Sequence, residues 1–251
     1  MSRGLRRFFV DQTFSEEGAV LQLSLHETFH LHRVLRLKAG DACRVFNREG
    51  WGAEAFIERI SQSEGALIRL KNIFPLKQKS LFLKVAQALP QKKKMDDLIE
   101  KAEELGVQEL WVMETQRTVV KMRQEASQRA RGRWERIVIE AAKQSGSPVL
   151  MEVRGPLPFE RVMKEKVGPT ERSFLFHPDP GGIGFSEMME EIRSVPKDIF
   201  LFFGPEGGFT EGEVRLAESR GARKVFLGNP ILRLETAFLG VISALRFLMP
   251  N

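Results

Sequence analysis

A glycine-rich loop near the C-terminus has the residue types and spacing that most clearly indicate ligand chemistry. The apolar segment Ile199–Phe203 predicts a buried strand, and it leads directly into the loop 204–208, whose sequence is Gly-Pro-Glu-Gly-Gly. Thr210 and Glu213 have the spacing of a capping box, which predicts that the next helix begins here. A glycine loop between a strand and a helix exposes bare backbone amides to a ligand. The pattern is neither a Walker A loop nor a G-x-G-x-x-G loop.

A second strand–loop–helix segment follows the first. A strand is expected over 224–227, and Gly228 and the loop 229–235 lead from it into a helix expected over 236–249. This helix has almost no polar face, so either the core of its own domain or a second subunit must cover it.

The segment from His26 to His30 matches the pattern H-E-x-x-H. On a helix this pattern places two imidazoles on one face for zinc, with Glu27 as a base. Ser24 and Glu27 also have the S-x-x-E spacing of a capping box, so the start of a helix explains the same residues. No third ligand stands out downstream. We favour the helix start and predict no metal site.

Basic residues gather in two parts of the chain. A helix beginning near Ser24 is expected to continue through Lys38, which places Arg33 and Arg36 on one face. The stretch 117–143 has eight basic and three acidic residues, more than salt bridges along a helix require. Contacts with an RNA backbone are favoured, although a solvated helix face is the alternative. The predicted RNA-binding residues are Arg6, Arg7, Arg33, Arg36, Lys92, Lys93, Lys94, Arg117, Lys121 and Arg123.

The composition indicates an ordinary globular protein. The 251 residues allow one or two domains, and 42% hydrophobic with 29% charged residues excludes disordered and fibrous classes. Cys43 is the sole cysteine, which excludes an internal disulfide and a thiolate zinc site. The longest apolar stretch, 237–249, is interrupted by Arg246 and is too short to span a bilayer. We therefore expect a cytoplasmic protein without a membrane segment.

The order of the expected elements divides the chain in two. The first ~70 residues predict short strands around one helix, which fits a small β-barrel-like domain. Pro75 blocks continuation of the last of these strands, so we predict domains at 1–73 and 74–251. Beyond this boundary strands and helices alternate, which predicts an α/β domain with a largely parallel sheet. Its expected helices include 93–105, closed by Gly106, then 124–145 and 185–193.

Five motifs in order resemble those of a known class of proteins. They are 32–36 with Gly40-Asp41, 99–107, 140–146, 204–208 and 227–237. Together they resemble the SPOUT class of S-adenosylmethionine-dependent RNA methyltransferases. Within it they are similar to the family that methylates N3 of one uridine in bacterial small-subunit (16S) ribosomal RNA. The similarity covers nearly the whole chain, with one departure at Ser147, where the family commonly has arginine.

The resemblance implies an architecture and partners. It implies a C-terminal trefoil-knotted SPOUT methyltransferase domain and a small N-terminal PUA-like β-barrel domain that binds RNA. It also implies a homodimer, with S-adenosylmethionine bound at the knot near the subunit boundary, and a ribosomal RNA substrate within the assembled or assembling 30S subunit. The apolar helix at 236–249 agrees with the homodimer.

The two loops supply the candidate site residues. S-Adenosylmethionine already has an activated methyl group, so no metal is needed, but the uridine imide must lose its proton. Arg233 is the candidate for stabilising the uracil anion, and Glu206 is the candidate base. The structural alternatives are a helix cap for Glu206 and an ion pair with Glu235 for Arg233. The candidate cofactor residues are Gly204, Glu206, Gly207, Gly208, Leu227, Gly228, Ile231, Leu232 and Arg233.

Two other functions are weighed against this one. A non-enzymatic RNA-binding protein would use the basic stretches alone, and it leaves both glycine loops unexplained. A zinc hydrolase would act through His26 and His30, and it depends on a five-residue pattern that also arises by chance.

Overall fold

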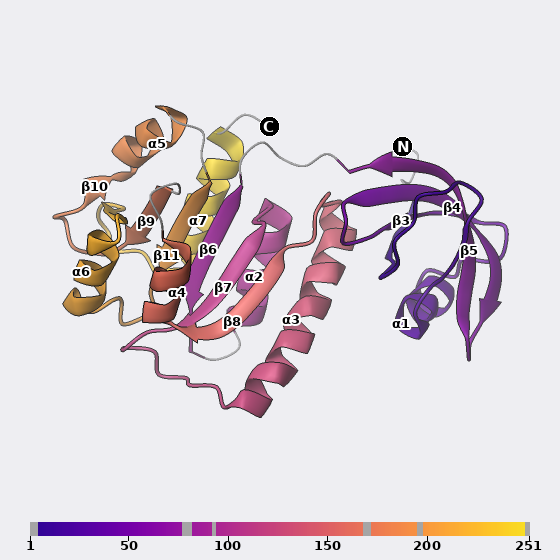
Figure 1. The fold of residues 1–251 in the computed structure, drawn as a ribbon, viewed down its shortest axis with the longest axis horizontal. Helices are drawn as coiled ribbons and strands as arrows, with labels where there is room; N and C mark the ends of the chain where they lie inside the picture. Colours follow the sequence, from indigo (N-terminus) through magenta and orange to yellow (C-terminus); the bar gives the residue numbers. More distant parts are fainter. Residues whose placement is uncertain (1–4, 77–81, 92–93, 168–171, 195–197, 249–251) are drawn as a thin grey trace. The chain divides into compact units, whose positions relative to one another are not determined.

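The computed structural model describes residues 5–76, 82–91, 94–167, 172–194 and 198–248, and the chain divides into two compact units (Figure 1). The N-terminal unit comprises Met1–Gln78 together with Ala142–Leu150. The C-terminal unit comprises Lys79–Ala141 and Met151–Asn251. The last residues of a long helix therefore belong with the N-terminal unit, although they lie beyond its sequence boundary.

The N-terminal unit is built on a five-stranded sheet in the order β1-β3-β4-β5-β2. Only β1 and β3 pair in parallel, and the other neighbours are antiparallel. Phe8, Leu31, Cys43 and Ile68 are fully buried at its centre. Burial raises the pKa of the Cys43 thiol to about 12, so this cysteine is a core residue. The strands are β1 (Arg7–Phe9), β2 (Val20–Gln22), β3 (Ala42–Phe46), β4 (Trp51–Ser61) and β5 (Gly65–Pro75).

The helix of this unit begins as predicted and ends early. The backbone N–H of Glu27 donates to Ser24 Oγ at the start of α1 (Leu25–Phe29). The chain then continues as the π-helical turn η1 (His30–Val34). The expected continuation through Lys38 is wrong, because the N–H of Leu35 donates to the His30 carbonyl and Arg36 adopts a left-handed backbone with φ 57°. Arg33 and Arg36 therefore do not share a helical face.

The C-terminal unit is an α/β structure with a fully parallel sheet in the order β10-β12-β9-β11-β6-β7-β8. The parallel sheet that the alternating pattern predicts is confirmed. The strands are β6 (Leu83–Ala88), β7 (Glu109–Glu114), β8 (Glu152–Pro158), β9 (Arg172–Phe176), β10 (Ile183–Gly184), β11 (Ile199–Phe203) and β12 (Arg223–Phe226).

Helices cover both faces of this sheet (Figure 1). Phe200 and Phe202 pack with α4 and α6 on one face. Phe203 points to the other face and contacts Phe238 of α7, which packs against α2. All five residues of β11 are buried, as expected for a strand covered on both sides. The helices are α2 (Lys94–Leu105), α3 (Gln124–Ser145), α4 (Phe159–Lys166), α5 (Phe185–Ser194), α6 (Glu211–Ser219) and α7 (Leu234–Leu248).

Most predicted elements of this unit are confirmed within a few residues. α3 has the predicted bounds, and Gly106 ends α2 with φ 79°. α7 begins at Leu234, two residues before the predicted start, and Met249 lies outside the described residues. β8 and α4 were not predicted. Among the described helices, none combines the length and the apolar character that crossing a membrane requires.

Candidate active site

The loops that follow three adjacent strands of the parallel sheet line one pocket. β12, β9 and β11 are neighbours, so their carboxyl ends lie at the same edge of the sheet. The loops that follow them enclose a pocket of about 530 Å³. Its lining residues are Lys94, Phe176, His177, Pro178, Phe203, Gly204, Pro205, Glu206, Gly207, Gly208, Phe226, Leu227, Gly228, Ile231, Leu232, Arg233, Leu234, Glu235 and Ala237.

All nine candidate cofactor residues line this pocket. The sequence interpretation missed the loop after β9, which contributes His177 and Pro178, and it did not connect Lys94 with this site. The β9 loop contains the glycine pair Gly181-Gly182, but the sequence interpretation did not recognise it as a ligand loop. Its place between the two glycine loops depends on the strand order, which the local sequence pattern does not reveal.

The backbone of the first glycine loop leaves little room for side chains. A Cβ on Gly204 would lie 3.2 Å from the Gly208 carbonyl carbon and from the Phe209 ring. Gly208 has φ +69°, a conformation that L residues adopt only with strain. A Cβ on Gly207, in contrast, would make ordinary contacts with the side chain of Arg117 at 3.5 and 3.6 Å. Side chains are therefore restricted by close contacts at Gly204 and by backbone conformation at Gly208, where a Cβ would meet open space.

One wall of the pocket is aromatic. The rings of Phe176 and Phe203 stack with centroids 4.6 Å apart, and the Phe203 ring also contacts Phe238 of α7. These contacts join the ends of β9 and β11 to the last helix. An apolar wall beside bare backbone suits a ligand with a flat ring and polar edges.

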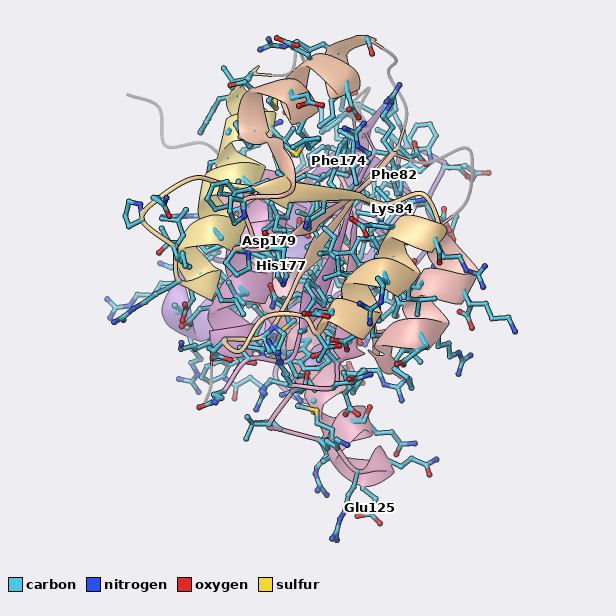
Figure 2. All side chains as sticks on the ribbon, turned by 90° about the vertical axis from the view of Figure 1, so that its left-hand side faces the viewer. Phe82, Lys84, Glu125, Phe174, His177 and Asp179 are labelled. Atoms are coloured by element: carbon cyan, nitrogen blue, oxygen red, sulfur yellow. The ribbon has the colours of Figure 1, made fainter. Side chains whose placement is uncertain are left out.

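His177 lies at the end of β9 with a fixed ring orientation. His177 and Asp179 are neighbours on this loop (Figure 2), and the Asp179 backbone N–H donates a hydrogen bond of 3.2 Å to His177 Nδ1. The ion pair with Lys224 and the N–H of Gly181 hold the pKa of Asp179 below its ordinary value. The loop after β9 is thus tied to β12.

Lys94 joins the two glycine loops. Its ammonium lies 3.5 Å from Glu206 Oε1 of the first loop and forms an ion pair with Glu235, which follows the second loop. Hydrogen bonding to Glu235 raises the pKa of Lys94, and the same bond lowers the pKa of Glu235. A single lysine at the start of α2 therefore connects both loops of the pocket.

These contacts bear on the two candidate catalytic residues. Glu206 also accepts a hydrogen bond of 3.0 Å from the Gln91 backbone N–H, so its oxygens are occupied by an ammonium and an amide. This makes it poorly suited to act as a base. Glu235 forms its close ion pair with Lys94, and the charge of Arg233 adds a weaker contribution that also lowers the pKa of Glu235. Within the described residues, the Arg233 guanidinium has no hydrogen bond or ion pair.

Arg117 supports the first glycine loop. Its Nη1 donates to the carbonyl oxygens of Gly207 at 2.8 Å and Phe209 at 3.3 Å. The buried Glu213 completes the predicted capping box with Thr210 and also accepts from the Gln116 backbone N–H at 2.8 Å. The segment that contains Arg117 is thereby fastened to the loop and to α6. Arg117 was predicted to bind RNA, and here its donors serve the loop.

The structure separates the other predicted RNA-binding residues into groups. The guanidinium of Arg7 lies 4.5 Å above the Phe46 ring and donates to the carbonyls of Ala142 and Ser147, so Arg7 is a structural residue. Lys94 belongs to the pocket, and Lys92 and Lys93 lie outside the described residues. The residues that the structure exposes are Arg6, Arg33, Arg36, Lys121 and Arg123.

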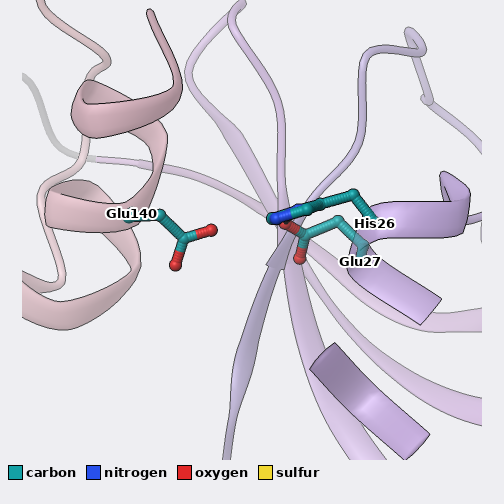
Figure 3. Close-up of side chains that lie close together, drawn as sticks. All are labelled: His26, Glu27 and Glu140. Atoms are coloured by element: carbon teal, nitrogen blue, oxygen red, sulfur yellow. Dashed lines mark ion pairs between the residues drawn. The ribbon is translucent and has the colours of Figure 1, made fainter. Parts of the chain in front are cut away.

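The H-E-x-x-H segment is used for structure. Glu27 lies beside His26 on α1 (Figure 3), and its carboxylate forms a buried ion pair of 2.8 Å with Lys143. The same ammonium lies 3.4 Å from Nδ1 of His30. Glu27 is thus used for an ion pair inside the N-terminal unit, and its backbone N–H is used for the helix cap at Ser24. The helix-start interpretation is the one that the structure supports.

The arrangement in the C-terminal unit is that of an enzyme domain that binds a nucleotide-like cofactor. Loops at the carboxyl ends of parallel strands form its pocket, and bare glycine backbone and aromatic rings line it. A family model described as an RNA methyltransferase domain matches residues 77–246.

Comparison with similar proteins identifies the family within the RNA methyltransferases. The chain is 32% identical over 219 residues to ribosomal RNA small subunit methyltransferase E of Synechocystis, covering 87% of this chain and 70% of the relative. It is 27% identical to the enzyme of the same name from Bacillus subtilis, over 97% of this chain and 96% of the relative. A crystal structure of this enzyme from Neisseria gonorrhoeae, bound to S-adenosyl methionine, matches with a TM-score of 0.87 and 25% identity, covering 97% of this chain and 98% of that one. The chain therefore belongs to the family of ribosomal RNA small subunit methyltransferase E, within the RNA methyltransferases.

Proposed function

We propose that this protein transfers a methyl group from S-adenosylmethionine to N3 of a uridine in small-subunit (16S) ribosomal RNA. One observation carries the proposal: the nine candidate cofactor residues, from two separate loops, line a single pocket at the carboxyl ends of three adjacent strands. The Neisseria relative, which has the same fold and binds S-adenosyl methionine, supports this assignment.

The pocket fits this cofactor in size and chemistry. Its volume of about 530 Å³ lies within the range of about 300–1,000 Å³ typical of small-ligand sites. The Gly208 N–H is used within the loop, where it donates to the Pro205 carbonyl at 2.8 Å, and the backbone at Gly204 and Gly228 lines the pocket beside it for hydrogen bonds along the edge of an adenine. The rings of Phe176 and Phe203 provide an apolar wall for its face. When bound, S-adenosylmethionine supplies an electrophilic methyl group.

The residues of the chain must then orient the uridine and ease the loss of its N3 proton. Arg233 is the candidate for this task, because its guanidinium lines the pocket and forms no hydrogen bond or close ion pair with another described residue. A cation here stabilises the negative charge that develops on the uracil ring as the proton leaves. Glu206 acts through its contacts with Lys94 and Gln91 as a residue that positions the first loop.

Two measurements test the function. Calorimetry should detect binding of S-adenosylmethionine to the purified chain. Incubation with cofactor carrying a tritiated methyl group and with small-subunit RNA should give labelled RNA whose modified nucleoside is 3-methyluridine. A chain that binds RNA but does not bind the cofactor would instead be a non-enzymatic RNA-binding protein. Tests with naked 16S RNA and with 30S particles would identify the preferred substrate.

The finer architecture is also a proposal. We propose that the C-terminal domain, 74–251, is trefoil-knotted in the SPOUT manner. Support comes from the strand order, which places β9 between β11 and β12, and from the return of α7 to pack on α2. The N-terminal domain, 1–73, is proposed to be a small PUA-like barrel domain that binds RNA, and its five-stranded sheet supports this proposal.

The proposed assembly is a homodimer that acts on ribosomal RNA in the cytoplasm. Apolar side chains at the pocket rim and at the end of α7 support the dimer, since Ile231 is 68% and Phe247 is 79% exposed. The exposed basic residues supply RNA backbone contacts; they are Arg6, Arg33, Arg36, Lys121 and Arg123.

A further inference from the structure

A second pocket lies in the N-terminal unit, beside α1 and the π-helical turn η1. It has a volume of about 340 Å³, which is at the lower end of the range of about 300–1,000 Å³ for small-ligand sites. We name it the α1 pocket. Its lining residues are Leu25, Thr28, Phe29, His32, Arg33 and Gln62.

The surface around the α1 pocket is unusually apolar for an exposed helix. Phe29 is 61% exposed, Leu25 is 54% exposed and Val34 is 58% exposed, although all three are large hydrophobic residues. A phenylalanine ring buries about 150–250 Å² in a core, so leaving it in solvent forgoes a large contribution to folding. Exposed apolar surface that is rimmed by polar groups marks a site of interaction.

The backbone here also departs from regular structure. The turn His30–Val34 is π-helical, and Arg36, two residues later, has φ 57°. π-Helical turns and left-handed non-glycine residues occur preferentially at functional sites, because their cost must be offset by a use. The irregular turn keeps Phe29, His32 and Arg33 together on one pocket.

The polar groups of the α1 pocket suit a nucleobase and its phosphate. Within the described residues, the Arg33 side chain has no hydrogen bond or ion pair, and Nδ1 of His32 is buried without a hydrogen-bond partner. The exposed amide of Gln62 offers a donor and an acceptor. An aromatic face, an amide and imidazole at its edge, and a guanidinium nearby are the groups that recognise an unstacked RNA base.

We propose that the α1 pocket binds one unstacked base of the RNA substrate. The base stacks on Phe29, its polar edge faces His32 and Gln62, and Arg33 contacts the adjoining phosphate. This inference rests on the proposed function, because it assumes that RNA is the substrate, and it adds a base-binding site in the N-terminal unit, separate from the methyltransferase pocket. The combination of an exposed aromatic ring with a cation favours a nucleic acid, because the two groups suit a stacked base and the phosphate beside it.

The test uses the full chain and a fluorescein-labelled oligouridylate of about ten residues, with binding followed by fluorescence anisotropy. Phe29→Ala should weaken binding by about fivefold or more, since stacking of one base contributes at least that much, and the salt dependence should stay unchanged. Arg33→Gln should reduce the slope of log K against log salt by about 0.7, the value for one phosphate of a single strand. The matched control is Phe56→Ala, an exposed phenylalanine of the same unit, which should bind as the wild type does.

Measurements of cofactor binding and methyl transfer by the wild type distinguish a failure of the α1-pocket proposal from a failure of the proposed methyltransferase function. If the wild type transfers methyl groups to small-subunit RNA but Phe29→Ala binds the oligouridylate normally, the α1 pocket is not a base site. If Phe29→Ala instead changes the mass measured by light scattering, the exposed face is a contact between copies of the chain and the inference is wrong. If the wild type neither binds RNA nor transfers methyl groups, the proposed function itself fails. His32→Ala is the second variant, and normal binding of the oligouridylate by this variant also overturns the proposal.

Discussion

Arg233 lies on the loop after β12 and lines the pocket, where it forms no hydrogen bond or close ion pair with another described residue. If it stabilises the uracil anion, Arg233→Ala should still bind S-adenosylmethionine, because the glycine backbone and the aromatic wall remain. Methyl transfer at saturating cofactor should fall at least tenfold, a barrier increase of about 1.4 kcal/mol or more. Single-turnover transfer of tritiated methyl groups, together with calorimetry, measures the two effects separately.

A control for this variant is Arg161→Ala, which removes an exposed arginine of α4 that pairs with Glu165. Its activity should match the wild type. If Arg233→Ala instead weakens cofactor binding and keeps its turnover at saturating cofactor, Arg233 is a residue of the cofactor loop and has no part in the chemistry.

Substitutions at Gly207 and Gly208 test the geometry of the first glycine loop, because Gly208 has a positive φ and Gly207 does not. Valine at Gly208 must adopt φ near +69°, which costs roughly 1–2 kcal/mol for an L residue and more for a β-branched one, so the loop should move out of place. Alanine at Gly207 makes only ordinary contacts with Arg117. Calorimetry should therefore show a loss of cofactor affinity of tenfold or more for Gly208→Val and a much smaller loss for Gly207→Ala. Equal affinities would contradict the loop geometry.

At the scale of elements, Lys94 connects the start of α2 to both glycine loops. Lys94→Met should weaken cofactor binding, since the loops lose their common anchor, and Lys94→Arg should restore part of it. Lys101→Met is the control, because Lys101 pairs with Glu100 and Glu104 on the same helix. Calorimetry at neutral pH measures the three affinities.

The pH dependence of this contact has a definite sign. The pKa of Glu235 is lowered in the folded protein, so the contribution of the pair is present above the ordinary value of 4.5 and is lost as the pH falls through the lowered value. The pKa of Lys94 is raised above its ordinary 10.5, so the contribution persists below that pH and is lost in stronger base. The affinity difference between wild type and Lys94→Met should therefore be constant from about pH 6 to about pH 9 and shrink in acid. A difference that varied within this window would exclude the ion pair as its cause.

Local patterns predict most elements of the C-terminal unit, and tertiary context explains the exceptions. α3 and the capping box at Thr210 are confirmed because helix periodicity and cap residues are local signals. β8 escaped prediction because Gly155, Pro156 and Pro158 are residues that strands disfavour. The sheet tolerates these residues because β8 is an edge strand.

The candidate site, like the secondary structure, was predictable from the sequence where local patterns mark its residues. Two of its loops have glycine close after an apolar strand, at Gly204 and at Gly228, and these signals are visible in the sequence. The β9 loop with His177 joins them only because β9 pairs with both β11 and β12, a consequence of strand order. The contact of Lys94 with Glu206 joins residues more than a hundred positions apart, so no local pattern contains it.

At the scale of the whole molecule, the exposed apolar surface near α7 bears on assembly. α7 buries Phe238, Val241, Ile242 and Leu245 against its own unit. Phe247 nevertheless remains 79% exposed, and Ile231 at the pocket rim remains 68% exposed. Apolar side chains left in solvent at both the pocket and the last helix favour a subunit contact that includes both.

If that contact forms, Phe247→Glu should disrupt it, because a carboxylate would have to lose its hydration inside an apolar interface. Light scattering at micromolar concentration should show a dimer for the wild type and a dissociation constant at least tenfold higher for the variant, about 1.4 kcal/mol. Cofactor affinity should fall with the dimer, since Ile231 belongs to the pocket as well. Arg161→Glu, on the opposite face of the sheet, should stay dimeric. A wild-type chain that is a stable monomer at this concentration would show that the exposed α7 surface has another use.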